Sequence, residues 1–186
     1  MDQAKIKREL AALAAEGMPE PEPVEETVEV EAVPEEQADA KPKKKGKEKA
    51  EPRLNGLIET PYDERGAHVD VQLNPDQVVR AAEILDSEGM TLEAVTGVDW
   101  LKEKQMEAVY DYTYTGGELF RVVIRARADR DQPDFPTISN VFGGANWHER
   151  ETWDLLGINF TGHPQLERLL LPEDADFHPL RKDYKP

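Results

Sequence analysis

The segment GGANWHERETWDLLGINFTGHP, residues 143–164, constrains the fold more than any other part of the chain. Asn146 followed by Glu149 is a capping-box pattern, which predicts that a helix begins there. Gly157 is the residue type that ends helices in the left-handed conformation. Apolar and polar residues then alternate over residues 158–161, which predicts a short half-buried strand before a glycine turn.

Four charged residues of this helix lie between large aromatic side chains. A desolvated charge without a partner is costly, so each of them needs a counter-charge or hydrogen bonds. Arg150 and Asp154 are one turn apart and are expected to pair with each other. Glu149 and Glu151 have no basic residue four positions away on either side. We expect their partners to come from elsewhere in the chain or from another protein.

The same segment contains a partial metalloprotease pattern. HERET begins like the zinc-binding sequence His-Glu-x-x-His, but the second histidine is replaced by Thr152. A metal or acid–base site would have to recruit His163 from the following turn to join His148 and Glu149. A stand-alone metal-dependent enzyme is therefore the most distant of the functional interpretations.

The C-terminal stretch, residues 165–186, differs in kind from the rest of the chain. It is interrupted by three prolines and has no regular period, yet it carries many apolar residues. Such a segment cannot build its own core, so we expect it to pack partly on its own domain and partly on a second protein. Arg181 is a candidate for bidentate binding of a carboxylate. The apolar residues are Leu166, Leu169, Leu170, Leu171, Phe177, Leu180 and Tyr184.

Two motifs at the right separation resemble the signatures of the 30 kDa subunit family of respiratory complex I, the NADH-quinone oxidoreductase. The resemblance runs from about residue 54 to the end of the chain and departs from the family pattern at Leu156 and Phe177. The first motif consists of Trp147, Glu149, Arg150, Glu151, Asp154, Gly157, His163, Pro164 and Arg168. The second consists of His178, Pro179, Leu180, Arg181, Lys182, Asp183 and Tyr184.

The resemblance implies a structural subunit in the peripheral arm of a proton-translocating NADH:quinone oxidoreductase. Such a complex passes electrons from NADH through FMN and iron–sulfur clusters to quinone. The motif residues would form the subunit interface, and the partners would be the quinone-pocket subunit and the cluster-bearing subunits. The implied location is peripheral, on the cytoplasmic side of the bacterial inner membrane, with the membrane reached only through partners.

A second interpretation is a homologous subunit of a sister machine. Membrane-bound energy-converting hydrogenases and related ferredoxin- or deazaflavin-driven dehydrogenases use a similar subunit. The residues of this chain do not indicate which electron donor is used.

Composition excludes several other functions. The chain has no cysteine, so it cannot hold a conventional iron–sulfur cluster or a thiolate zinc site, and no cofactor is expected in it. Its net charge of −16 argues against nucleic-acid binding, which needs a basic surface. No apolar run approaches the length of a bilayer span. Residues 54–186 hold 13 basic and 25 acidic residues, which suggests basic patches on the partner.

Three regions are expected along the chain. Residues 1–53 are predicted to hold a short helix at residues 2–16 and then a disordered extension, because residues 18–53 consist of acidic and lysine-rich blocks. Residues 54–164 are predicted to form the folded domain. Residues 165–186 are predicted to be an extended docking arm.

The predicted domain is an α+β fold with a small, mostly antiparallel sheet and helices on one face. Gly116-Gly117 is a typical two-residue hairpin turn. In the strand after it, Phe120, Val122, Ile124 and Ala126 are expected to face the core. The predicted elements are a strand at residues 69–73, a helix from Pro75 to Gly89, strands at 92–99, 109–115 and 119–127, a loop at 128–136, and a helical turn at 139–142.

Overall fold

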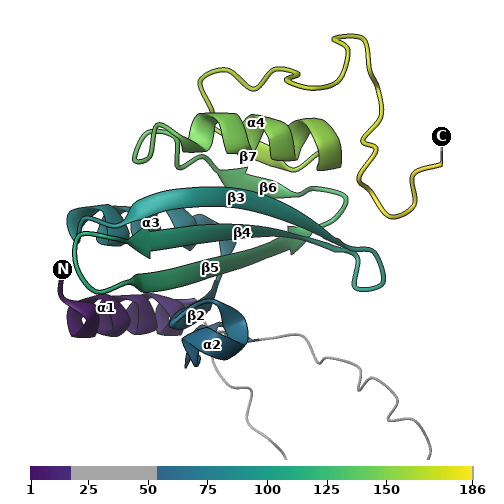
Figure 1. The fold of residues 1–186 in the computed structure, drawn as a ribbon. Coiled ribbons are helices and arrows are strands. Elements are labelled where there is room, and N and C mark those ends of the chain that lie inside the picture. Colours follow the sequence, from purple (N-terminus) through teal and green to yellow (C-terminus); the bar gives the residue numbers. More distant parts are fainter. Residues whose placement is uncertain (18–53, 186) are drawn as a thin grey trace, which may run out of the picture. The chain divides into compact units, whose positions relative to one another are not determined.

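The computed structural model describes residues 1–17 and 54–185. The predicted disordered extension at residues 18–53 lies outside the described residues. The elements follow one another in the order α1, β1, α2, β2, η1, α3, β3, β4, β5, β6, α4 and β7, and a non-repetitive arm follows β7 (Figure 1).

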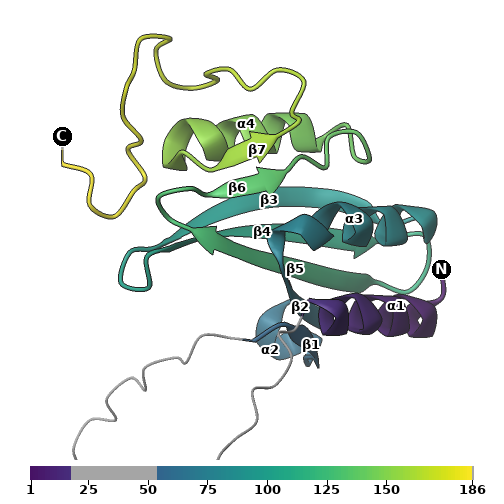
Figure 2. The same cartoon turned by 180° about the vertical axis from the view of Figure 1, so that it is seen from behind.

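A five-stranded sheet forms the centre of the fold, with the strand order β1-β2-β5-β4-β3 (Figure 2). Only β2 and β5 are parallel, and the other three pairs are antiparallel. A second sheet joins β6 and β7 in parallel. The strands are β1 (Gly56–Glu59), β2 (Val69–Leu73), β3 (Thr91–Trp100), β4 (Gln105–Tyr114), β5 (Phe120–Asp129), β6 (Asp134–Pro136) and β7 (Asn159–Thr161).

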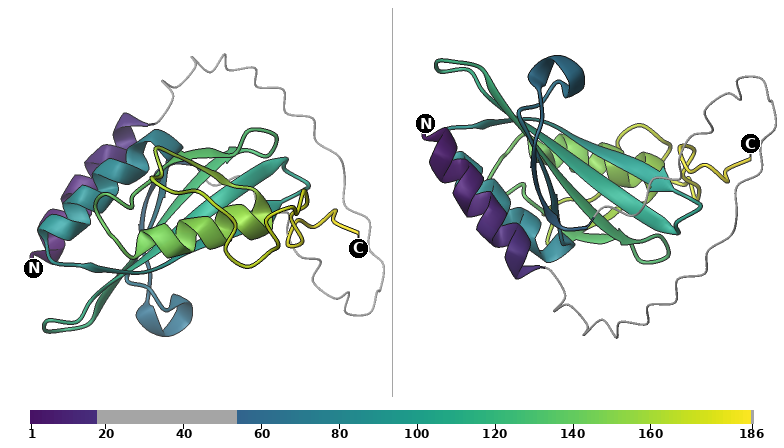
Figure 3. Two further views of the ribbon diagram at one scale, coloured as in Figure 1. Left: turned by 90° about the horizontal axis from the view of Figure 1, so that it is seen from above. Right: turned by 90° about the horizontal axis from the view of Figure 1, so that it is seen from below.

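Helices α1, α3 and α4 supply apolar side chains to the main core, which lies on one face of this sheet. The same helices are seen in Figures 2 and 3. A small separate cluster joins Ala67, Val109 and Val123. On β5, the alternation places Phe120, Val122, Ile124 and Ala126 in that core, as predicted. The α+β class with a mostly antiparallel sheet is therefore confirmed. The helices are α1 (Gln3–Glu16), α2 (Tyr62–Arg65), the 3-10 helix η1 (Pro75–Gln77), α3 (Val78–Ser87) and α4 (Ala145–Leu156).

The opposite face of the sheet carries charged side chains that pair across strands. Arg125 on β5 contacts Asp70 on β2, and Arg127 on β5 donates to Glu107 on β4. Opposite charges on neighbouring strands stabilise a sheet through such cross-strand pairs. This explains how Asp70 and Glu107 remain buried on a face that the core does not fill.

Several elements differ from the sequence prediction. Tyr114 pairs with Phe120, so the glycine turn is part of a five-residue loop and not a two-residue turn. A second hairpin joins β3 to β4 and was not predicted. The expected loop at 128–136 contains β6. The expected helical turn at 139–142 is a single hydrogen-bonded turn, in which the N–H groups of Val141 and Phe142 donate to Ile138, and it is too short to count as a helix. Three-residue strands such as β6 are too short to show alternation.

The N-terminal helix α1 packs on the domain, although it was assigned to the region before residue 54. Its apolar face is buried at Ile6, Leu10 and Leu13. Its last turn is held by the side chain of Gln77, which donates to the carbonyl oxygen of Leu13 at 2.6 Å. The helix belongs to the same compact unit as the chain from Leu54 onward.

Replacing Leu10 by alanine tests this packing. Leu10 is fully buried, so Leu10→Ala should lower the free energy of unfolding by about 2–5 kcal/mol in urea denaturation. Leu54 is 74% exposed, so Leu54→Ala is the matched control and should change it by less than about 0.5 kcal/mol. Equal effects of the two substitutions would contradict the placement of α1 in the core.

Candidate functional site

The candidate site is formed by α4 and the C-terminal arm, which we define as residues 165–185. Both predicted motifs lie there, apart from Gly157, His163 and Pro164, which lie in the segment between α4 and the arm. Gly157 ends α4 in the left-handed conformation with φ of 76°, as predicted. A Cβ atom at this position would lie 2.6 Å from Arg181 Nη2 and 2.7 Å from His178 Nε2. Glycine is therefore required here by the backbone conformation and by the close approach of the arm.

Asp154 attaches the first part of the arm to α4. Its Oδ1 accepts a hydrogen bond from Arg168 at 2.8 Å. Its Oδ2 accepts the backbone N–H groups of Leu169, Leu170 and Leu171 at 3.1, 2.7 and 3.0 Å. One buried carboxylate thus fixes three successive residues of a segment that has no regular secondary structure.

The same bonds determine the protonation of this carboxyl group. Burial by itself would raise the pKa of Asp154, but the hydrogen bond from Arg168 and the three backbone N–H groups together lower that pKa to about 2.

The expected pair between Arg150 and Asp154 is wrong. Arg150 donates instead to the carbonyl oxygens of Glu167 and Arg168, and its guanidinium lies 5.2 Å from the centre of the Trp147 ring.

The second motif satisfies the carbonyl groups at the end of α4, which have no partner within the helix. His178 Nδ1 lies 3.0 Å from the carbonyl oxygen of Asp154. The backbone N–H of Leu180 donates to Leu155, and Arg181 Nε donates to Leu156 at 2.7 Å. Arg181 therefore binds a helix carbonyl, where sequence analysis expected a carboxylate.

The end of the arm is attached to the β3–β4 hairpin. The backbone N–H of Lys182 donates to Asp99 at 2.8 Å, and Arg130 donates to both Asp99 and Asp183. Tyr184 stacks on Phe177, with ring centres 5.5 Å apart. Sequence analysis did not identify Asp99 and Arg130 as site residues, because neither belongs to a motif and their partners in the arm are distant in sequence.

The predicted capping box at the start of α4 is wrong. The helix begins at Ala145, and Asn146 lies in its first turn. The first N–H groups donate to carbonyl oxygens of residues 142–144, so no capping side chain is needed. Glu149 is buried and contacts Thr137 Oγ1, and it accepts the N–H of Ile138 at 2.9 Å.

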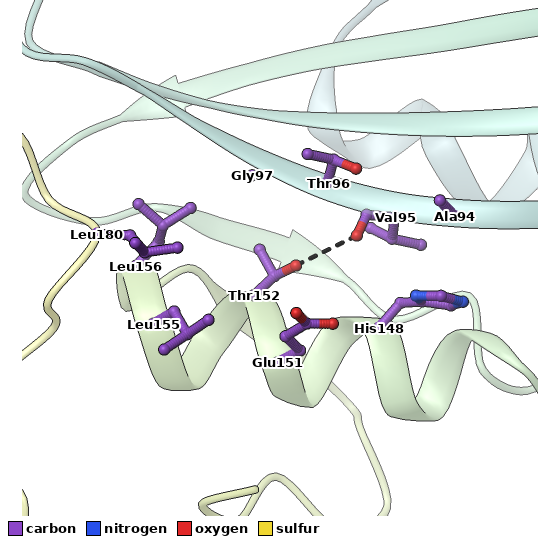
Figure 4. A pocket seen from close by; sticks show the side chains of 10 residues that line it. All are labelled: Ala94, Val95, Thr96, Gly97, His148, Glu151, Thr152, Leu155, Leu156 and Leu180. Carbon is purple, nitrogen blue, oxygen red and sulfur yellow. Dashed lines mark hydrogen bonds between the residues drawn. The ribbon is translucent and has the colours of Figure 1, made fainter. Parts of the chain in front are cut away.

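The three residues of the possible metal site are not brought together. Glu149 and His163 lie inside the protein, with Oε2 and Nε2 3.8 Å apart. His148 lines a hollow between α4 and β3 (Figure 4). Pro164 is exposed in the turn after β7. Across residues 1–17 and 54–185, no group of three or more histidines, cysteines and acidic residues is arranged to hold a metal ion.

That hollow has a volume of about 250 Å³ and is lined by residues of β3, α4 and the arm. Glu151, Leu155 and Leu180 lie around it (Figure 4). The Glu151 carboxylate makes no hydrogen bond or ion pair with any described residue. The exposed apolar side chains nearby include Trp147, which is 59% exposed, and Leu180, which is 57% exposed. We call Trp147, Glu151, Leu155 and Leu180 the outer α4 surface.

Comparison with known proteins identifies the family. Residues 71–186 match the model of the family described as respiratory-chain NADH dehydrogenase, 30 Kd subunit. The chain belongs to this family. The predicted resemblance to the complex I 30 kDa subunit family is thereby confirmed.

A relative and one solved structure support the 30 kDa family assignment, and a second solved structure shows the same fold. An NADH-quinone oxidoreductase subunit from Roseiflexus sp. (strain RS-1) is 40% identical over 120 residues, which is 62% of this chain and 68% of the relative. The trypsin-resistant fragment of Nqo5 has a TM-score of 0.52 at 25% identity, covering 60% of this chain and 89% of the fragment. A chain of the archaeal membrane-bound sulfane sulfur reductase shares the fold, with a TM-score of 0.57 at 24% identity, covering 63% and 71%.

Asp154→Asn tests the attachment of the arm. The pKa of Asp154 is lowered, so its carboxylate stabilises the folded state above about pH 4, and this stabilisation is lost as the pH falls through about 2. The substitution should lower the free energy of unfolding at pH 7 by roughly 2–3 kcal/mol, measured by urea denaturation. Asp174→Asn, at an exposed position of the arm, is the control and should have little effect. An Asp154→Asn variant as stable as the wild type would refute this role.

Proposed function

We propose that this chain is a structural subunit of the peripheral arm of a proton-translocating NADH:quinone oxidoreductase. The family match over residues 71–186 carries this proposal, together with a relative that is named as a subunit of such an enzyme. In this proposal the chain supports assembly with the quinone-pocket subunit and with the cluster-bearing subunits. It has no self-contained active site.

We further propose that the redox groups of the complex, FMN and the iron–sulfur clusters, are held by other subunits, as are the binding sites for NADH and quinone. The absence of cysteine from the sequence supports this division, because iron–sulfur clusters are held mainly by cysteine thiolates. Within the part of the chain that the structure describes, no helix is long and apolar enough to cross a membrane. We place the chain on the cytoplasmic side of the bacterial inner membrane, held there through its partners.

The outer α4 surface is the best candidate for the contact with a partner. Its exposed Trp147 and Leu180 provide apolar area, and buried aromatic side chains are frequent anchors of protein interfaces. Glu151 provides a carboxylate with no counter-charge among the described residues. A partner with an apolar side chain and a neighbouring lysine or arginine would complement both features.

The sister machines remain the second candidate. The fold shared with the sulfane sulfur reductase chain shows only that this architecture also occurs outside NADH dehydrogenases. The 40% identity to an NADH-quinone oxidoreductase subunit favours the first candidate. The genes next to this one should discriminate them, through the presence or absence of flavin- and NADH-binding subunits.

Co-purification from solubilised membranes tests the proposed function. The tagged chain should bring down a multi-subunit complex that contains FMN and iron–sulfur absorbance and oxidises NADH with a quinone acceptor. Recovery of the chain as a monomer, or in a complex without flavin and NADH oxidation, would contradict the proposal.

Substitutions on the outer α4 surface and in the arm should weaken assembly. Glu151→Ala should leave the thermal stability of the isolated chain unchanged and lower the recovery of the complex on native gels. A loss of about 1.4 kcal/mol of binding free energy would weaken the affinity for the partner about tenfold. Arg181→Ala should lower both the thermal stability of the isolated chain and the recovery of the complex, because Arg181 attaches the arm to the carbonyl oxygen of Leu156. Glu118→Ala in the distant hairpin loop is the control. A Glu151→Ala variant that assembles normally but loses turnover would indicate a role in the chemistry instead.

A further inference from the structure

Glu149 is a buried carboxyl group that contacts residues 137–138. Its side chain is 0% exposed. Among residues 1–17 and 54–185, no lysine or arginine forms an ion pair with it, and the nearest basic group is His163 at 3.8 Å. A buried carboxylate that lacks a counter-charge is strongly disfavoured relative to its neutral form.

His163 cannot supply the missing positive charge while it keeps its present contacts. Its Nδ1 accepts the backbone N–H of Gln165 at 3.1 Å. Its Nε2 lies 3.3 Å from the carbonyl oxygen of Asn146, which can only accept. This network assigns a neutral ring with its proton on Nε2. Burial and the charge of Arg150 also lower the pKa of His163, although the bond to Asn146 opposes them.

A chain of hydroxyl groups leads away from Glu149. Thr137 Oγ1 contacts Glu149 Oε2 and lies 2.8 Å from Ser139 Oγ. Ser139 is only half-buried. Hydroxyl groups both donate and accept, so the chain can exist in two directions. With an ionised Glu149, Thr137 donates to the carboxylate and Ser139 to Thr137. With a protonated Glu149, the carboxyl donates to Thr137 and Thr137 to Ser139.

The other titratable groups near this site do not form an ion pair with Glu149 among the described residues. Tyr110 and Tyr112 on β4 are buried, and burial raises the pKa of both phenols above their ordinary value. Burial also raises the pKa of Glu149, to about 7, although its hydrogen bonds from Thr137 and Ile138 act in the opposite direction. Arg150, the next residue on α4, is engaged by the arm.

We propose that Glu149 is a proton-binding site that exchanges its proton with solvent through Thr137 and Ser139. The carboxylate takes up one proton from water as the pH falls toward neutrality, and the hydroxyl chain reverses its direction. The neutral form holds α4 to residues 137–138 more strongly, because no uncompensated charge is then buried. This inference concerns the chain by itself and is independent of the proposed function.

The stability consequence follows from the direction of the shift. The pKa of Glu149 is higher in the folded than in the unfolded state, so its stabilisation is complete below about pH 4.5 and is lost as the pH rises through about 7. For the full chain, the unfolding equilibrium constant should rise up to tenfold per pH unit across this window. Glu149→Gln should remove this contribution, and Glu151→Gln, the exposed control, should retain it. Superimposable pH profiles of wild type and Glu149→Gln would overturn the proposal.

A spectroscopic measurement tests protonation directly, including the case in which Glu149→Gln does not fold. Difference infrared spectroscopy of the wild-type chain should show a protonated carboxyl band at pH 6 that disappears by pH 8.5. Thr137→Val removes the hydroxyl donor to the ionised form, so it should move the midpoint of this band to higher pH. If no protonated carboxyl band disappears between pH 6 and pH 8.5, the assignment is contradicted. An unshifted midpoint in Thr137→Val would contradict it as well.

Discussion

The carboxylate of Asp154 is the interaction on which the C-terminal half of this structure depends. It lies at the end of a helix, where it meets three consecutive backbone N–H groups and the guanidinium of Arg168. A carboxylate with this many donors is stable without water, although it is buried. Residues 169–171 have no regular secondary structure, so their N–H groups would otherwise need solvent or another partner.

The arm in turn completes the end of α4. His178, Leu180 and Arg181 satisfy the last carbonyl groups of the helix, and Gly157 leaves the space in which they approach. The helix and the arm therefore stabilise each other. A segment that resembles a loose tail in sequence is held at both ends, by α4 and by Asp99 and Arg130 near the β3–β4 hairpin.

This mutual attachment sorts the motif residues into two groups. Most of them bind other parts of the same chain. These contacts satisfy their polar side chains, so no partner protein is needed to explain why the residues are polar. A smaller group has exposed side chains, notably Trp147, Glu151 and Leu180. The apolar and charged character of this second group supports the proposed docking role more directly than the motif as a whole.

Local patterns were sufficient to predict the longer helices and strands, but not the short elements β1, α2 and β6. Alternation in β5 identified its core face, and Gly157 marked the end of α4. Contacts between distant residues were not predictable in the same way. Glu149 stands at the capping-box position, but it bonds Thr137 and Ile138 because the preceding turn already satisfies the helix start. Asp154 has a basic residue one turn away, yet its partner is Arg168 in an aperiodic segment.

Amide hydrogen exchange at residues 169–171 tests the central claim most directly. If Asp154 holds this part of the arm, the three amides of the isolated wild-type chain should exchange slowly, and they should lose protection in Asp154→Asn while amides of β4 and β5 keep theirs. Rapid exchange of the three amides in the wild type would contradict the account. It would mean that the arm is ordered only when a partner covers it.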